Sequence, residues 1–266
     1  MTQIDSTKDN FYTQKRSMPP LGGYNLTFLK IEILRLLRNR RNIIFTIITP
    51  VVFYFMFGGG KSIHQKMGNG NASSYVMISL AVYGAMIATT ATGASVAVER
   101  AAGWSRQLRI TPLRPGAYIA IKISSALIMG VFPVVAVFVT GALNGAQMTF
   151  AAWIISGFVA IGGALVFVPF GLFAGYLMPS ESVMQILGPV LAILAFVGGL
   201  FVPMAFLNST FRNIAKFTPA YGIGEIARSP MMGHGFDIAS VANVIIWMAI
   251  FAFGAAMLFR RDTGRV

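Results

Sequence analysis

One stretch without charge constrains this chain most: residues 123–180 contain no Asp, Glu, Lys or Arg. A soluble domain carries about one charged residue in four, and a membrane-spanning helix needs roughly 20 mostly apolar residues. The stretch therefore holds two spans and a short turn, for which Asn144, Gly145 and Gln147 are candidates. Because the whole chain is 56% hydrophobic and only 11% charged, we predict an all-α polytopic membrane protein.

Six stretches are apolar and long enough to cross a bilayer. They are residues 42–60, 74–98, 118–143, 150–178, 183–205 and 238–259. Small residues let membrane helices approach closely. We therefore interpret the glycines of the fourth span as packing contacts: Gly157, Gly162, Gly163, Gly171 and Gly175.

The positions of Lys and Arg predict the orientation, because cytoplasmic loops of membrane proteins are enriched in both. With the amino terminus inside, cytoplasmic segments hold sixteen of them and outer segments hold five, namely Lys61, Lys66, Arg212, Lys216 and Arg228. We therefore expect a multi-pass protein of the cell membrane with both termini in the cytoplasm. The net charge of +13 follows from this topology and does not indicate nucleic-acid binding.

An amphipathic segment precedes the first span. After a cytoplasmic tail (residues 1–23), residues 24–41 place apolar side chains on one helical face and Glu32, Arg35 and Arg38 on the opposite face. This pattern predicts an interfacial helix. The alternative is that its basic residues only fix the topology.

A second apolar segment, residues 206–237, lies between the fifth and sixth spans. It is too apolar for a solvated loop and too interrupted to cross the bilayer twice. Irregular backbone at membrane depth is tolerated where protein or water satisfies it. We therefore predict short re-entrant helices on the extracellular side.

The loop after the second span is the most informative soluble part. Residues 99–109 contain no proline, and Thr111-Pro112 follows them, so they can form a short helix that stops there. On that helix Arg100, Trp104 and Leu108 share one face, which favours docking to a protein partner. An ordinary basic loop with Trp104 among the lipid headgroups is an equally good interpretation.

Several kinds of chemistry lack the residues they need. The sequence has no cysteine, and its two histidines, His64 and His234, are far apart, which argues against a metal site. The first 20 residues are polar, so no cleavable signal peptide is expected. The sequence has no G-x-x-x-x-G-K-[ST] phosphate loop, and no charge lies well inside a span, which leaves proton coupling without a relay.

Motifs follow one another in a fixed order along nearly the whole chain. After the basic helix come Glu99-Arg100, Gly103, Leu108 and Thr111-Pro112-Leu113. The fifth span ends in Gly198-Gly199-Leu200-Phe201-Val202-Pro203, and Phe217-Thr218-Pro219-Ala220-Tyr221 follows, with Glu225 and Arg228 beyond it. In this order the chain resembles the membrane subunit of ABC-2 type exporters, which include permeases for daunorubicin-like drugs, sodium and surface polysaccharides.

The resemblance implies a transport subunit and not an enzyme. Two permeases, identical or homologous, would pair with two cytoplasmic ABC ATPase subunits that bind ATP and magnesium, while this chain itself holds no cofactor. Residues 99–110 would be a coupling helix on the ATPase, through Glu99, Arg100, Gly103, Trp104, Gln107, Leu108 and Pro112. Residues 24–41 would be a connecting helix with a matching role for Glu32, Arg35, Arg38 and Arg41. The exit would be closed by the extracellular segment, with gate residues Gly199, Pro203, Phe217, Pro219 and Tyr221.

The cargo follows less directly from the sequence. The second and fifth spans are the central pair in the resembled family, so Tyr83, Phe196 and Phe201 are candidates for the substrate path, although packing or lipid contact is the simpler role for each. An uncharged path rich in Met and Phe favours an amphiphilic small molecule, drug, lipid or peptide. Two other classes stay open: an ATP-independent channel or scramblase, and a membrane-embedded enzyme built on scattered acids.

Overall fold

The computed structural model describes residues 20–58, 65–103, 113–204 and 208–263. Within them, six helical segments are long and apolar enough to cross a membrane. These are α2 (Arg40–Gly58), α3 (Ala72–Ala94) with α4 (Val96–Ala101), α6 (Pro115–Leu143), α7 (Phe150–Gly163) with α8 (Phe167–Leu177), α9 (Ser180–Val197) and α12 (Ile238–Thr263). Strands β1 (Lys66–Met67) and β2 (Gly70–Asn71) form an antiparallel hairpin. The predicted all-α polytopic fold is confirmed.

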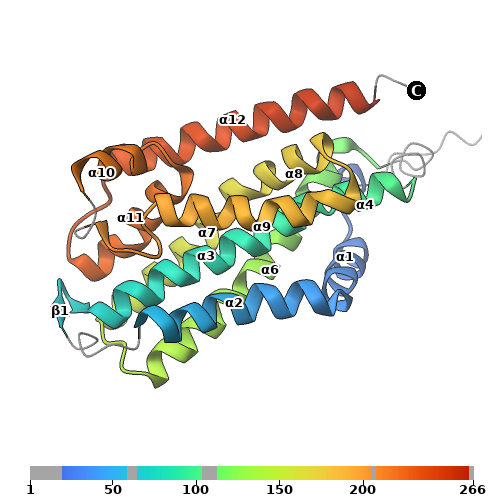
Figure 1. Cartoon of the computed structure of the whole chain (residues 1–266). Coiled ribbons are helices and arrows are strands. Elements are labelled where there is room, and N and C mark those ends of the chain that lie inside the picture. Colours follow the sequence, from blue (N-terminus) through green and yellow to red (C-terminus); the bar gives the residue numbers. More distant parts are fainter. Residues whose placement is uncertain (1–19, 59–64, 104–112, 205–207, 264–266) are drawn as a thin grey trace, which may run out of the picture.

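The spans lie side by side in one bundle with two distinct ends (Figure 1). One end, called the α1 end, carries α1 (Leu26–Arg38), α4 and the carboxyl end of α12. The other, called the hairpin end, carries β1, α10 (Ser209–Ala215) and α11 (Pro219–Met232). The described chain therefore starts and finishes at the same end, as six crossings require.

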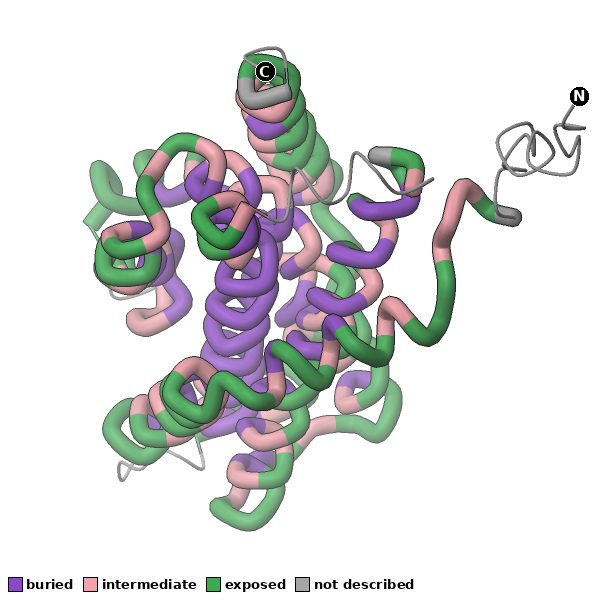
Figure 2. Tube along the Cα trace, turned by 90° about the vertical axis from the view of Figure 1, so that its right-hand side faces the viewer, coloured by how far each residue is buried: buried purple, intermediate pink, exposed green. Residues whose placement is uncertain are grey.

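The centre of the bundle is α3, which the other helices surround (Figure 2). In the span formed by α3 and α4, 94% of an apolar stretch of 18 residues is buried, against 39% or less of the corresponding stretch in each of the other five. A helix that is buried on every side must be apolar all round. The many Ala, Gly, Ser and Thr residues of α3 also let neighbours approach its backbone closely.

Glycines of the fourth span allow α8 to touch α3 backbone to backbone. A Cβ added to Gly171 would overlap the carbonyl oxygen of Thr90, and one added to Gly175 would lie 2.6 Å from a side-chain carbon of Val96. These positions have the predicted packing role. Gly162 does not, because nothing lies within 4 Å of a Cβ placed there.

The segment between α9 and α12 turns back into the bundle. Its second helix, α11, packs against α3, α7 and α12. A Cβ on Gly163, halfway along the fourth span, would lie 2.8 Å from Cγ2 of Ile223 in α11. The short helices predicted for this segment are thus present, and one of them reaches the middle of the bundle.

Two predicted helices end several residues earlier in the structure. The fifth span ends at Val197 and not near residue 205, because a turn at Gly199 with φ of +70° breaks the helix. The predicted helix over 99–110 is not continuous either. It starts as the end of α4, which stops at Ala101, and Gly103 then has φ of +71°, a conformation that favours glycine. Residues 104–112 lie outside the described residues.

Candidate functional site

Four charged side chains form a closed ring at the α1 end. Glu32 and Arg35 come from α1, Glu99 from α4, and Lys122 from the second turn of α6. The Glu32 carboxylate lies 2.7 Å from Nη2 of Arg35 and 2.6 Å from Nζ of Lys122. Glu99 contacts the same two cations. Each carboxylate therefore contacts both cations, and we call these four residues the ionic ring.

Most of the ionic ring is shielded from solvent. Glu32, Glu99 and Lys122 are 5%, 4% and 1% exposed, whereas the Arg35 side chain is 43% exposed. Burial lowers the pKa of Arg35, but the charges of Glu99 and Glu32 outweigh burial and leave that pKa above its ordinary value. The guanidinium thus stays charged.

Neutral groups complete the hydrogen bonding of the ionic ring. The Tyr118 hydroxyl of α6 donates to Oε2 of Glu99 at 2.5 Å. Lys122 donates to Oγ of Ser95 at 3.0 Å, and that hydroxyl donates to Oε1 of Glu99 at 3.2 Å. Buried charges persist in proteins when they are paired and hydrogen-bonded in this way. The ring thereby joins α1 to the second and third spans.

The ionic ring corrects one prediction. The pattern of residues 24–41 predicts Glu32 on the face opposite the apolar side chains, yet Glu32 and Leu36 are the two buried residues of α1. This prediction is wrong because cations from distant segments compensate the buried carboxylate, which helical periodicity cannot reveal. Lys122, in the second turn of the third span, is one of these cations. The other two predicted residues of the connecting helix, Arg38 and Arg41, are exposed.

Arg100 meets a neighbouring helix of its own chain. It donates to the carbonyl oxygens of Tyr176 at 3.0 Å and Gly175 at 3.3 Å. Carbonyls in the last turn of a helix have no partner within that helix, so Arg100 caps α8. The predicted helical face of Arg100, Trp104 and Leu108 is not continuous with α4, which ends at Ala101. The remaining predicted coupling residues, Trp104, Gln107, Leu108 and Pro112, lie outside the described residues.

A second buried charge lies toward the hairpin end. Arg228 of α11 is 1% exposed. Its guanidinium donates to Glu225 at 2.5 Å and to Oγ of Ser79 at 3.0 Å, and it lies 4.7 Å from the centre of the Tyr75 ring. Because Ser79 and Tyr75 belong to α3, Arg228 fastens α11 to the central helix. The sequence places Arg228 among the outer charges and, with Glu225, in the motif that follows Tyr221, but it does not indicate the contact with α3.

The turn after α9 packs against the first turn of α11. A Cβ on Gly198 would lie 3.0 Å from the backbone nitrogen of Tyr221. Three of the predicted gate residues therefore belong to the two turns that meet here: Gly199, Pro219 and Tyr221. Phe217 is 77% exposed and Pro203 is half-buried.

Two of the three predicted path residues touch each other. The rings of Tyr83 and Phe201 meet edge to face with centres 4.8 Å apart, and Phe53 of α2 lies 6.1 Å from Tyr83 and 5.3 Å from Phe201. Phe196 is 47% exposed on α9 and lies outside this aromatic cluster. The cluster joins α2, α3 and the turn after α9.

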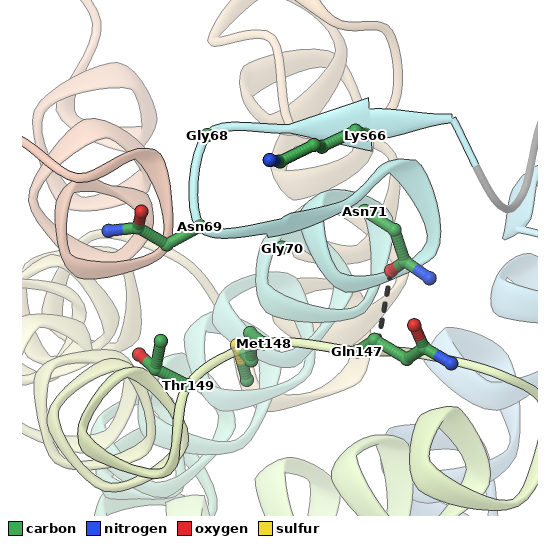
Figure 3. A pocket seen from close by; sticks show the side chains of 8 residues that line it. All are labelled: Lys66, Gly68, Asn69, Gly70, Asn71, Gln147, Met148 and Thr149. Carbon is green, nitrogen blue, oxygen red and sulfur yellow. Dashed lines mark hydrogen bonds between the residues drawn. The ribbon is translucent and has the colours of Figure 1, made fainter.

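The hairpin end carries an open cavity of about 600 Å³ beneath the β1–β2 hairpin (Figure 3). Asn71 anchors its floor, because its side chain accepts from the backbone of Gln147 at 3.1 Å and donates to the carbonyl of Gly145 at 2.7 Å. The backbone nitrogen of Asn69 donates to the carbonyl of Met231 at 2.7 Å. The hairpin thus links the predicted turn between the third and fourth spans to the end of α11.

Among the described residues, no group of three or more His, Asp or Glu side chains is placed to hold a metal ion. The acids of the ionic ring are instead bound to cations of the protein. Each carboxylate contacts two cations of the protein and carries no free acid group toward solvent or a metal. The arrangement suits mechanical linkage between helices better than proton transfer or hydrolysis.

Comparison with known proteins agrees with this architecture. The model of the ABC-2 type transporter family matches residues 25–232. The chain is also 25% identical over 233 residues to a protein described as "Putative transport permease YvfS" from Bacillus subtilis (strain 168), an alignment that covers 87% of this chain and 95% of that protein. The chain folds into a bundle of six apolar helices with short re-entrant helices before the last one, and the family model matches most of its length. The chain is therefore a permease that belongs to the ABC-2 type transporter family.

Proposed function

We propose that this chain is the membrane subunit of an ATP-driven exporter. Two permeases, identical or homologous, work with two copies of a separate cytoplasmic ABC ATPase, which binds ATP and magnesium. The protein lies in the cell membrane. Its α1 end faces the cytoplasm, and its hairpin end faces the outside of the cell. The cargo is an amphiphilic small molecule, drug, lipid or peptide.

The observation that carries the proposal is the ionic ring. Transport against a gradient needs an energy input, and intramembrane acids of ion-coupled transporters usually mark ion pathways. Here the buried acids Glu32 and Glu99 are each held by two cations of the protein. The ring also joins α1, which we propose contacts the ATPase, to the second and third spans. A displacement of α1 by the ATPase would therefore reach the bundle core and bias it between inward and outward states.

The hairpin end supports the assignment of an exit. Alternating access requires a closed barrier on one side at a time, and α11 with the turn at Gly199 fills the bundle there. Arg228 fastens this barrier to α3, and the aromatic cluster of Phe53, Tyr83 and Phe201 lies along the turn. Apolar aromatic surface next to a gate suits amphiphilic cargo.

The test is reconstitution of the purified chain with an ABC ATPase subunit from the same cells. Vesicles are loaded with ATP on the ATPase side, and movement of a fluorescent amphiphile is followed. The proposal predicts co-purification of the two proteins and movement only with hydrolysable ATP. Equal movement by the chain alone would identify a channel or scramblase instead. Movement of a small hydrophilic ion as the sole cargo would contradict the amphiphilic assignment.

A further inference from the structure

The ionic ring is built from two parts that are each electrically neutral. Glu32 and Arg35 are three residues apart on α1 and pair with each other at 2.7 Å. Glu99 and Lys122 pair with each other on the bundle. We call these the two internal pairs. The other two contacts, Lys122 with Glu32 at 2.6 Å and Arg35 with Glu99, cross between α1 and the bundle; we call them the two crossing pairs.

This arrangement matters for the cost of separating α1 from the bundle. Isolating a buried charge costs several kcal/mol per ion, and breaking a buried pair leaves such a charge behind. If α1 moves away, both crossing pairs break but both internal pairs remain. Each side keeps one acid and one base, so separation leaves no unpaired charge on either side.

The surroundings of both internal pairs fit separation. On the bundle, Tyr118 and Ser95 still bind Glu99 and Lys122 when α1 is absent. On α1, the side chain of Arg35 is already 43% exposed, so water replaces its lost partner with little change.

The apolar contact that holds α1 is also small. Leu36 is the one apolar residue of α1 that is buried, in a minor cluster with Ala88 and Met129. By contrast, the core around α3 comprises more than twenty buried residues. Few apolar contacts therefore hold α1 on the bundle, and the two crossing pairs determine where it binds.

We infer that the ionic ring is a releasable latch: α1 detaches from and returns to the bundle as a neutral unit, and the crossing pairs set the register of its return. The physiological meaning of this latch rests on the proposed function, in which the ATPase moves α1. The latch itself is a property of the permease alone and is tested without ATPase or cargo.

The experiment uses four double variants that each remove one acid and one base. Two remove an internal pair: Glu32→Gln with Arg35→Gln, and Glu99→Gln with Lys122→Gln. Two remove a crossing pair: Glu32→Gln with Lys122→Gln, and Arg35→Gln with Glu99→Gln. After loss of an internal pair the remaining ion pair lies within one side, so nothing ionic opposes separation. After loss of a crossing pair the remaining pair spans the interface, and separation would leave a lone charge on each side.

The readout is the reaction of a single cysteine with a water-soluble maleimide in membranes, because the chain has no cysteine of its own. Leu36→Cys reports separation, since Leu36 is 8% exposed, and Leu34→Cys is the matched control on the same helix at 43% exposed. Loss of an internal pair should speed labelling at position 36 about tenfold, the equivalent of one charge-assisted hydrogen bond. Loss of a crossing pair should leave labelling at or below the unaltered rate, and labelling at position 34 should stay constant throughout.

Equal rates for both classes of double variant would overturn the latch. Faster labelling of the crossing-pair variants than of the internal-pair variants would overturn it as well. Each class has two members, so one misfolded variant, recognised by aggregation in detergent, leaves the comparison intact. A failed latch with normal ATP-driven transport would refute this inference alone, whereas a working latch without any ATPase partner would refute the proposed function alone.

Discussion

Replacement of Glu99 by Gln tests the ionic ring as a stabilising element. The carboxylate is 4% exposed and accepts from Arg35, Lys122, Ser95 and the Tyr118 hydroxyl. An amide has one acceptor oxygen, and its NH₂ group would face donors. Loss of one partner of a buried ion pair costs about 3–5 kcal/mol. We expect the lower end, about 3 kcal/mol, because Lys122 keeps Glu32 at 2.6 Å.

The assay is thermal unfolding of the purified chain in detergent. For domains of 150–250 residues about 2–4 °C corresponds to 1 kcal/mol, so Glu99→Gln should lower the midpoint by about 6–12 °C. The control is Glu181→Gln, because Glu181 is an exposed acid in the first turn of α9, and its change should stay within about 0.5 kcal/mol. Equal midpoints for the two variants would refute the view that the ring stabilises the bundle.

Three further outcomes follow from the structure. Gly171→Ala should lower the unfolding free energy by about 1–3 kcal/mol and Gly162→Ala should not lower it, measured by denaturant unfolding, because only the first forces α8 away from α3. Arg228→Met should release α11 from α3 and raise proteolytic cleavage of the segment around α10 and α11, as seen in the digestion pattern. Hydrogen bonds from Ser240 and nearby backbone lower the pKa of Asp237. The contribution of Asp237 to stability is therefore present above its unfolded pKa of about 4 and is lost as the pH falls through the lower folded pKa. Asp237→Asn should remove this acid dependence of the unfolding midpoint.

The spans could be predicted from the sequence because lipid imposes a simple rule on them. Runs of about 20 apolar residues located all six crossings, and the glycine at position 171 indicated a close helix contact. The span ends were less certain. The fifth helix stops at Val197 because Gly198 and Gly199 form a turn, although apolar residues continue beyond it.

The ionic ring could not be predicted, because its members come from three segments. Glu32 and Lys122 are 90 residues apart in the chain and meet at 2.6 Å. Periodicity assigns a charged residue to the solvent face unless a partner is known, and the partner is known only once the helices are packed. The same limit applied to Arg228, whose contacts with Ser79 and Tyr75 cross from α11 to α3. The sequence did offer one signal for the ionic ring, because Lys122 lies within a turn or two of the start of an otherwise apolar span.

The central claim is that the ionic ring carries movement of α1 into the bundle during ATP-driven export. The most direct measurement is the number of cargo molecules moved per ATP hydrolysed by the reconstituted complex, with Glu32→Gln and Arg35→Gln combined. We predict that this complex assembles and hydrolyses ATP while the ratio falls at least about tenfold, the loss expected for one charge-assisted contact. An unchanged ratio in this variant, with Glu181→Gln as the control, would contradict the claim.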